Sequence, residues 1–134
     1  MQTVVDFLKN SGIQYFATVG LDGKPKVRPF QFMFEDGGKL YFCTSNQKPV
    51  FKQIQGNPFV EICSCGENFS WIRLSGKVVF SQDMNLKNKV FEVSPVVKSV
   101  YKTADNPAFE LFYLEDAEAV ITDFSGNPPK TINL

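Results

Sequence analysis

The sequence predicts a mainly β fold, an antiparallel barrel with short helices attached, and three observations support this. Strand-like segments follow one another across tight-turn signals such as Asp22-Gly23 and Asp36-Gly37-Gly38, which favour hairpins. Helical periodicity is confined to short stretches, so the strand–helix alternation of a parallel α/β fold is missing. The chain of 134 residues suits one domain, which we expect over residues 1–134.

The first half of the chain is expected to form two helices and three strands. Thr3 and Asp6 resemble a capping pair and predict a helix over residues 3–10. Lys48-Pro49 predicts the start of a second helix, because proline suits the first helical position. Aromatic and β-branched runs predict strands over residues 15–20, 27–35 and 39–44.

The second half is expected to be richer in strand, with one clear helix. Leu86 and Val90 are four residues apart and predict a helix over 83–91, whereas 94–107 is expected to be a loop with at most one helical turn. The remaining segments are strands over 59–64, 69–81, 109–114 and 117–124, with a short tail over 130–134.

The strand over 27–35 is unusual because both of its faces are largely apolar. Alternate residues of a strand share a face, so Arg28, Phe30, Phe32 and Phe34 are expected to lie together. This pattern predicts a strand covered on both sides. Pro29 cannot donate a ladder hydrogen bond and marks an edge, a bulge or a gap in the pairing.

Composition excludes several mechanisms. The chain has no His, so a Ser-His-Asp or Cys-His nucleophile, an HExxH metal site and His-ligated haem iron are impossible, and no metal site is expected. The 14 basic and 14 acidic side chains balance, which argues against nucleic acid as a partner. No segment approaches about 18 consecutive apolar residues, so no membrane span is expected. A cofactor that brings its own chemistry is therefore favoured.

Cysteine usage gives an expectation about the compartment. Cys43, Cys63 and Cys65 are an odd number, and no signal peptide precedes them, which predicts a reduced, cytoplasmic protein with buried thiols. Strand alternation places Cys63 and Cys65 on one face, where packing explains them better than zinc binding does.

A candidate phosphate site lies where a strand ends and a helix begins. Thr44 and Ser45 provide hydroxyl donors, Lys48 provides a positive charge, and the start of the helix offers unpaired N–H groups. The alternative is that Ser45 or Asn46 caps the helix and that Lys48 is a solvated surface residue.

Arg28 and Arg73 are the two arginines of the chain, and both lie in apolar strands. Arg28 needs a partner, which is either a phosphate or carboxylate of a ligand or an internal carboxylate, for example that of Glu61 or Glu35. Arg73 shares a predicted strand face with Phe69, Trp71 and Ser75, which suits a ligand or a partner chain. The alternative is an ordinary amphipathic strand.

Together these features resemble the FMN-binding split-barrel proteins of the pyridoxamine 5′-phosphate oxidase-like family, in its small single-domain, nitroimidazole-resistance-like branch. The segments that carry the resemblance are, in chain order, Leu21–Pro25, Val27–Phe30, Leu40–Ser45, Lys48–Pro49, Asn57–Pro58 and Trp71–Gly76. The resemblance implies a six-stranded antiparallel Greek-key split barrel. It also implies a homodimer with FMN at the subunit interface.

The resemblance further implies which residues contact FMN. Those of the chain's own site are Arg28, Pro29, Phe30, Gln31, Cys43, Thr44, Ser45, Lys48 and Gln53, with Lys48 at the phosphate and Gln53 at the ribityl chain. Those that face the flavin from the other subunit are Trp71 and Arg73.

The resemblance implies an FMN-dependent oxidoreductase that acts on a small molecule by hydride or electron transfer, with no catalytic acid or base identified. No GxGxxG motif accompanies a strand and helix, so a reduced nicotinamide donor, NAD(P)H, would bind only transiently. Two alternatives stay open: a non-catalytic flavin-binding redox or stress-related protein, and a split-barrel dimer that binds another ligand.

The 14 phenylalanines are more than one core of this size obviously needs. Several of them are therefore expected to line the dimer interface or the flavin, and the candidates are Phe32, Phe34, Phe69, Phe109 and Phe112.

Overall fold

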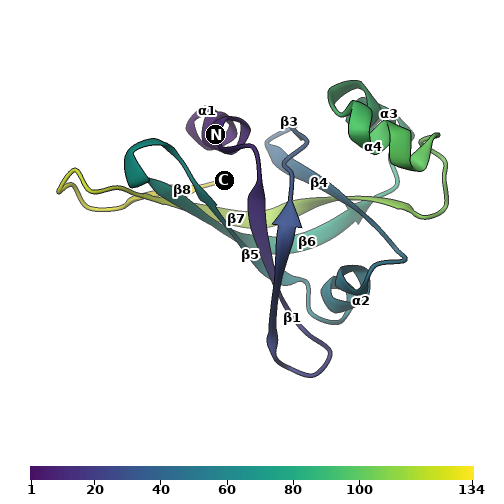
Figure 1. Cartoon of the computed structure of the whole chain (residues 1–134), viewed down its shortest axis with the longest axis horizontal. Coiled ribbons are helices and arrows are strands. Elements are labelled where there is room, and N and C mark those ends of the chain that lie inside the picture. The colour runs from purple at the N-terminus through teal and green to yellow at the C-terminus, as the bar shows by residue number, and fades with distance from the viewer.

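The computed structural model describes residues 1–134 and shows eight antiparallel strands in one curved sheet with four α-helices at its margins (Figure 1). The strand order is β2-β1-β5-β6-β7-β4-β3, and β8 pairs with β7. The strands are β1 (Gln14–Val19), β2 (Pro25–Phe30), β3 (Phe34–Asp36), β4 (Lys39–Ser45), β5 (Phe59–Cys65), β6 (Trp71–Ser81), β7 (Phe109–Thr122) and β8 (Lys130–Asn133). The helices are α1 (Gln2–Ser11), α2 (Pro49–Gly56), α3 (Met84–Val93) and α4 (Pro95–Tyr101).

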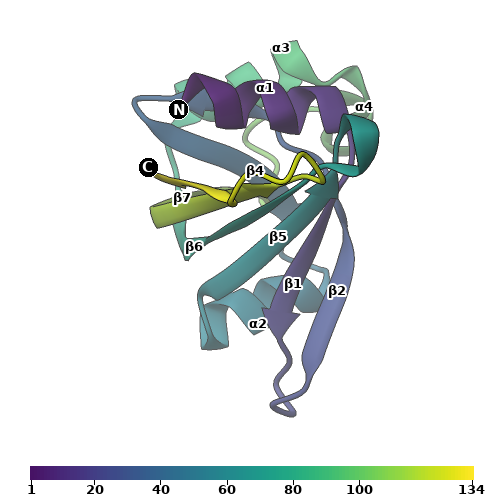
Figure 2. The same cartoon turned by 90° about the vertical axis from the view of Figure 1, so that its left-hand side faces the viewer.

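The concave side of the sheet holds the main core. Figures 1 and 2 show α1 and α2 at opposite ends of the sheet. Helix α1 buries Val4, Val5 and Leu8 in this core, and α2 buries Val50 and Ile54. These residues recur at helical spacing, which gives each short helix one apolar face for the sheet.

Phenylalanine rings form the centre of this core. Phe16 stacks on Phe30 with ring centroids 4.5 Å apart and meets Phe42 and Phe112 edge-on at 6.3 and 5.7 Å. A second, smaller cluster lies against α3 and α4, where Val90 and Tyr101 pack with Phe109 and their neighbours. The chain therefore buries its apolar side chains in two separate clusters.

These two clusters correct the expectation for the phenylalanines. Phe32, Phe34, Phe109 and Phe112 are all buried within the chain's own core and do not line a free surface. Phe69 alone is exposed, and it lies in a 3₁₀ turn over Glu67–Phe69 instead of on the strand face of Trp71. The excess of rings is explained because both clusters are built from aromatic side chains.

The mainly β class is confirmed, but the six strands implied by the resemblance are too few, since the structure has eight. The segment over 27–35 divides into β2 and β3. The backbone N–H of Phe32 donates to Gln14 Oε1 at 2.5 Å, and that of Met33 donates to the Tyr41 carbonyl at 3.0 Å. Phe32 and Met33 are both buried, one in each cluster, which strict alternation along a strand does not allow.

The expectation of a strand covered on both sides is also wrong for the chain by itself. Strand β2 is at the edge of the sheet, and its outward residues Val27 and Pro29 are exposed. The edge position of Pro29 agrees with its lack of an N–H donor.

Near the C-terminus, the two strands predicted over 109–114 and 117–124 form one strand, β7. The pairing shifts between Ser75 and Lys77 of β6, opposite an extra residue in β7, and Asp116 has a positive φ of 52° there. This is a β-bulge, which bends a strand without ending it. The tail expected over 130–134 contains strand β8.

The segment over 94–107 contains a helix where a loop was expected. Helix α4 begins at Pro95, and the Ser94 hydroxyl caps it by accepting from the Val97 N–H at 3.3 Å. A serine cap followed by proline at the first helical position is a recognisable start signal. None of the four helices is long and apolar enough to span a membrane.

The expectation of buried thiols fails for two of the three cysteines. Cys63 and Cys65 are exposed, because β5 alternates and turns Val60, Ile62 and Ser64 inward. Cys43 is half-buried.

Candidate functional site

A pocket of about 300 Å³ opens between the end of β2, strand β4 and helix α4. We call it the apolar pocket, because most of the side chains that line it carry no polar group. The residues that line it are Ile13, Pro29, Phe30, Gln31, Met33, Cys43, Thr44, Lys48, Val96, Val97, Val100 and Tyr101. Lys48 is the one charged residue among them.

The wall of the apolar pocket contains one polar atom without a partner. Thr44 is only 3% exposed, and its Oγ1 makes no hydrogen bond within the chain. A buried hydroxyl that has lost its water and gained no partner costs about 1–3 kcal/mol. The oxygen itself has less than 1 Å² of accessible surface, so it faces the packed interior and not the open space of the pocket.

The two other ionisable groups of the pocket stay neutral at physiological pH. Burial raises the pKa of the Cys43 thiol to about 12, against a small opposing effect of Lys48. Burial also raises the pKa of the Tyr101 hydroxyl. The interior of the apolar pocket therefore carries no negative charge and no thiolate nucleophile.

A second pocket, of about 480 Å³, lies beside the first between α2 and the β1–β2 turn. We call it the basic pocket, because three lysines line it and Asp22 is its one acid. Its lining residues are Leu21, Asp22, Lys26, Asn46, Gln47, Lys48, Pro49, Lys52 and Gln53. Lys48 lines both pockets, so its side chain marks the place where they adjoin.

The turn between β4 and α2 explains the position of Lys48. The Ser45 carbonyl accepts from the Lys48 N–H at 3.1 Å, and the Ser45 hydroxyl accepts from the Gln47 N–H at 3.1 Å. Lys48 itself is the N-cap of α2, and no side chain caps the helix. The alternative in which Ser45 or Asn46 caps α2 is therefore wrong, since Asn46 instead donates to the Pro107 carbonyl.

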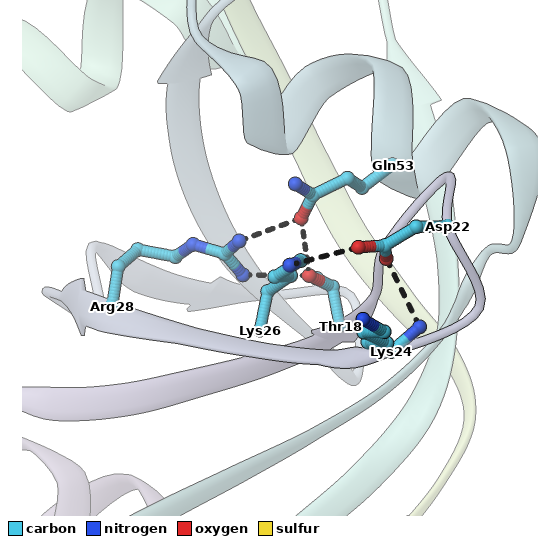
Figure 3. Close-up of polar contacts among 6 residues, drawn as sticks. All are labelled: Thr18, Asp22, Lys24, Lys26, Arg28 and Gln53. Carbon is cyan, nitrogen blue, oxygen red and sulfur yellow. Dashed lines mark hydrogen bonds and ion pairs between the residues drawn. The ribbon is translucent and has the colours of Figure 1, made fainter.

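Arg28 is held by the protein's own polar groups (Figure 3). Its guanidinium donates to Thr18 Oγ1 at 2.7 Å, to Gln53 Oε1 at 2.6 Å and to the Phe16 carbonyl at 3.2 Å. Partial burial lowers the pKa of Arg28 from its ordinary value, and no carboxylate is its partner. The predicted alternative of an ion pair with Glu61 or Glu35 is wrong.

The Arg28 contacts tie α2 to the β1–β2 hairpin. Gln53 Oε1 also accepts from Thr18 Oγ1 at 2.6 Å, so one amide oxygen of the helix receives donors from both strands. Arg28 lines neither pocket. Through Gln53, Arg28 instead fixes the position of α2, whose start lies where the two pockets adjoin.

Trp71 and Arg73 lie outside both pockets on the convex face of the sheet. The strand register places Pro29, Tyr15, Cys63 and Arg73 side by side in that order. With neighbouring strands about 4.8 Å apart, Arg73 is about 14 Å along the sheet from Pro29. Arg73 pairs instead with Glu61 at 3.1 Å.

The structure thus brings together part of the predicted site. Pro29, Phe30, Gln31, Cys43, Thr44 and Lys48 line the apolar pocket, and Gln53 lines the basic pocket with Lys48. Ser45, the last residue of β4, lines neither pocket, and Arg28, Trp71 and Arg73 are not in either wall. Sequence reasoning missed Lys26, Lys52 and the α4 residues. The Ser94-Pro95 start signal could have revealed α4, but no local signal places it against β2.

A sequence model of the pyridoxamine 5′-phosphate oxidase family matches residues 1–121. The chain belongs to the pyridoxamine 5′-phosphate oxidase family. The crystal structure of a NimC/NimA family protein from Clostridium acetobutylicum is 36% identical in sequence and superposes with a TM-score of 0.91. The match covers 100% of this chain and 93% of that one. No match was found among curated proteins.

Members of this fold bind different groups. A pyridoxamine 5′-phosphate oxidase-related, FMN-binding protein from Nostoc punctiforme is 19% identical, with a TM-score of 0.66 over 97% of this chain and 86% of that one. HutZ, a haem storage protein from Vibrio cholerae, is 15% identical, with a TM-score of 0.67 over 85% of this chain and 87% of that one. At these identities the likeness shows the split-barrel fold alone, and the ligand has to be argued from the site.

Proposed function

We propose that this chain binds FMN and acts as an oxidoreductase on a small molecule. The observation that carries the proposal is the adjacency of the two pockets at Lys48, one apolar and one basic. A flavin mononucleotide has the matching parts, because a flat ring with polar edges is joined to a phosphate dianion. A relative with the same fold is described as FMN-binding.

The residues present fit this cofactor. Pro29, Phe30 and Gln31 would contact the ring, and Lys48 would hold the phosphate. Arg28 would act through Gln53 by fixing α2, and not by touching the phosphate. When bound, FMN supplies hydride and electron transfer.

The chain's own groups then exclude water and set polarity. The valines of α4 cover one side of the apolar pocket, and Cys43 and Tyr101 stay protonated there. Neither group offers a general base near neutral pH. The protein's part in the reaction is to position the ring and its partner in a dry environment.

We also propose that a second copy of the chain completes the site. Arg73 and Trp71 are too far along the convex face to reach the apolar pocket of their own chain, as the strand register shows. The same face exposes large apolar side chains, including Tyr15, Val27 and Phe59. A homodimer that packs these faces together would cover them and bring Trp71 and Arg73 near a partner's flavin.

The first experiment is flavin binding by the purified chain, followed as quenching of FMN fluorescence and as a yellow protein that releases FMN on denaturation. Lys48→Gln is expected to weaken FMN about ten-fold or more, because it removes a charge-assisted contact to the phosphate. Riboflavin, which has no phosphate, should be weakened little by the same change. Lys9→Gln, on α1, is the matched control.

Two results would refute the proposal. A colourless protein that neither quenches FMN nor gains its absorbance would exclude both flavin functions and leave a barrel for another ligand. FMN bound equally well by Lys48→Gln and the native chain would show that the phosphate lies elsewhere. NAD(P)H oxidation with quinones or nitro-compounds separates an oxidoreductase from a non-catalytic flavoprotein, and sedimentation velocity tests the homodimer.

A further inference from the structure

The basic pocket is larger than one phosphate requires. Its volume of about 480 Å³ exceeds the roughly 300 Å³ of the apolar pocket, which is proposed to take a whole flavin ring. Its three lysines come from two elements: Lys26 is on β2, Lys48 is the N-cap of α2, and Lys52 is within α2. The basic pocket therefore has unfilled volume and two further lysines, Lys26 and Lys52, beyond the phosphate that Lys48 would hold.

The lysines of this pocket are not all neutralised by the protein. Asp22 pairs with Lys26 at 3.3 Å, and its own pKa is lowered first by the Lys24 backbone N–H (Figure 3). Lys48 and Lys52 have no carboxylate within ion-pair distance. Both lysines line the same pocket, so an anion beside them would offset the repulsion between two like charges.

The spacing of these groups indicates the kind of anion. Lys48 is the N-cap of α2 and Lys52 lies one helical turn further on, which is a rise of about 6 Å along the helix axis. Flexible lysine side chains at that separation can reach two linked phosphates at once. Leu21, which is 74% exposed, adds an apolar surface on the same pocket against which a nucleoside can pack.

We propose that the basic pocket is a second phosphate subsite, which takes the second phosphate and attached nucleoside of a dinucleotide. This rests on the proposed function, since it places the FMN phosphate, or the corresponding flavin-side phosphate of FAD, at Lys48. The dinucleotide has two possible sources: a resident flavin dinucleotide, FAD, or a nicotinamide dinucleotide that binds after FMN. Both present an adenosine-linked phosphate to Lys52, and the experiment distinguishes them.

The test compares FMN, FAD and ADP as probes on the full chain. In the first arm, the flavin-free chain is titrated with FMN and with FAD, and Lys52→Gln is expected to weaken FAD about ten-fold while changing FMN by less than about three-fold. In the second arm, the FMN-loaded chain is titrated with ADP by calorimetry. Binding of ADP that Lys52→Gln weakens about ten-fold supports the nicotinamide source. Lys24→Gln removes the same charge from the β1–β2 turn beside the pocket, without lining it, and is the matched control.

Each outcome decides a different point. If Lys52→Gln weakens FMN and FAD equally, or changes neither FAD nor ADP binding, the second subsite is excluded while FMN binding stands. If no flavin binds but ADP binds in a Lys52-dependent way, the proposed function fails and the phosphate subsite stands. If Lys24→Gln has the same effect as Lys52→Gln, only the general charge of the region matters and the subsite is excluded.

Discussion

The two faces of the same sheet differ in how far the chain completes them. On the concave face Phe16, Phe42 and Phe112 have no exposed surface, and the chain's own rings fill the space. On the convex face Tyr15 and Phe59 are more than half exposed. One chain therefore suffices to fill the core of the barrel, whereas its outer face and the edge at β2 keep large apolar side chains exposed.

The largest expected effect is at the centre of the concave face. Phe112→Ala should lower the free energy of unfolding by about 3–5 kcal/mol, because it removes a fully buried ring and leaves a cavity. Phe59→Ala, its convex-face counterpart, should cost less than about 0.5 kcal/mol in a dilute monomer. Urea unfolding at one protein concentration measures both.

Measuring Phe112→Ala and Phe59→Ala at several protein concentrations tests whether a second copy of the chain covers the convex face. A cost for Phe59→Ala that grows with protein concentration would show that a second copy covers the convex face. Equal costs for the two variants in the monomer would contradict the difference between the faces.

The two arginines provide a second, smaller contrast. Arg28→Met should cost about 1–3 kcal/mol, because it leaves the partly buried Thr18 and Gln53 groups without their shared donor. Arg73→Met removes one exposed ion pair with Glu61 and should cost about 0.2–1 kcal/mol. Thermal unfolding of both variants, at matched concentration, measures the difference, and a larger cost for Arg73 would reverse the assignment of structural and surface roles.

The smallest expected effect on stability at neutral pH is that of replacing the Cys43 thiol. The pKa of Cys43 is raised by burial from 9.0 to about 12, so the unfolded chain ionises first. The stability that the buried neutral thiol provides is therefore complete below pH 9 and is lost as the pH rises from about 9 towards about 12. Cys43→Val should change little at pH 7 and should flatten the decline above pH 9.

Chemical unfolding across this pH range checks the prediction, with Cys65→Ser as the control on the exposed face. Tyr41 and Tyr101, whose pKa values are also raised by burial, leave a residual decline in every variant. A decline equally steep in Cys43→Val and the native chain would show that the thiol does not contribute.

Local sequence signals predicted most elements because their causes are local. Proline at the start of α2, the Asp22-Gly23 turn and the alternation of β5 each act within a few residues. The order of such signals also gave the resemblance to the family, which the match over residues 1–121 confirms. The residues proposed around Lys48 followed from the same short segment, and most of them line one pocket.

The mainly β class, the family and the strand–turn–helix segment that presents Lys48 can all be inferred from the sequence. The end of β2 at Phe30, the bond from Arg28 to Gln53 instead of to a carboxylate, and the position of α4 over the apolar pocket become visible in the folded chain. These features join residues that are far apart in the sequence. The sheet closes around its core and so brings Gln14 to Phe32 and Arg28 to Gln53. The pattern of a single segment does not indicate which distant group will accept a hydrogen bond from a given donor.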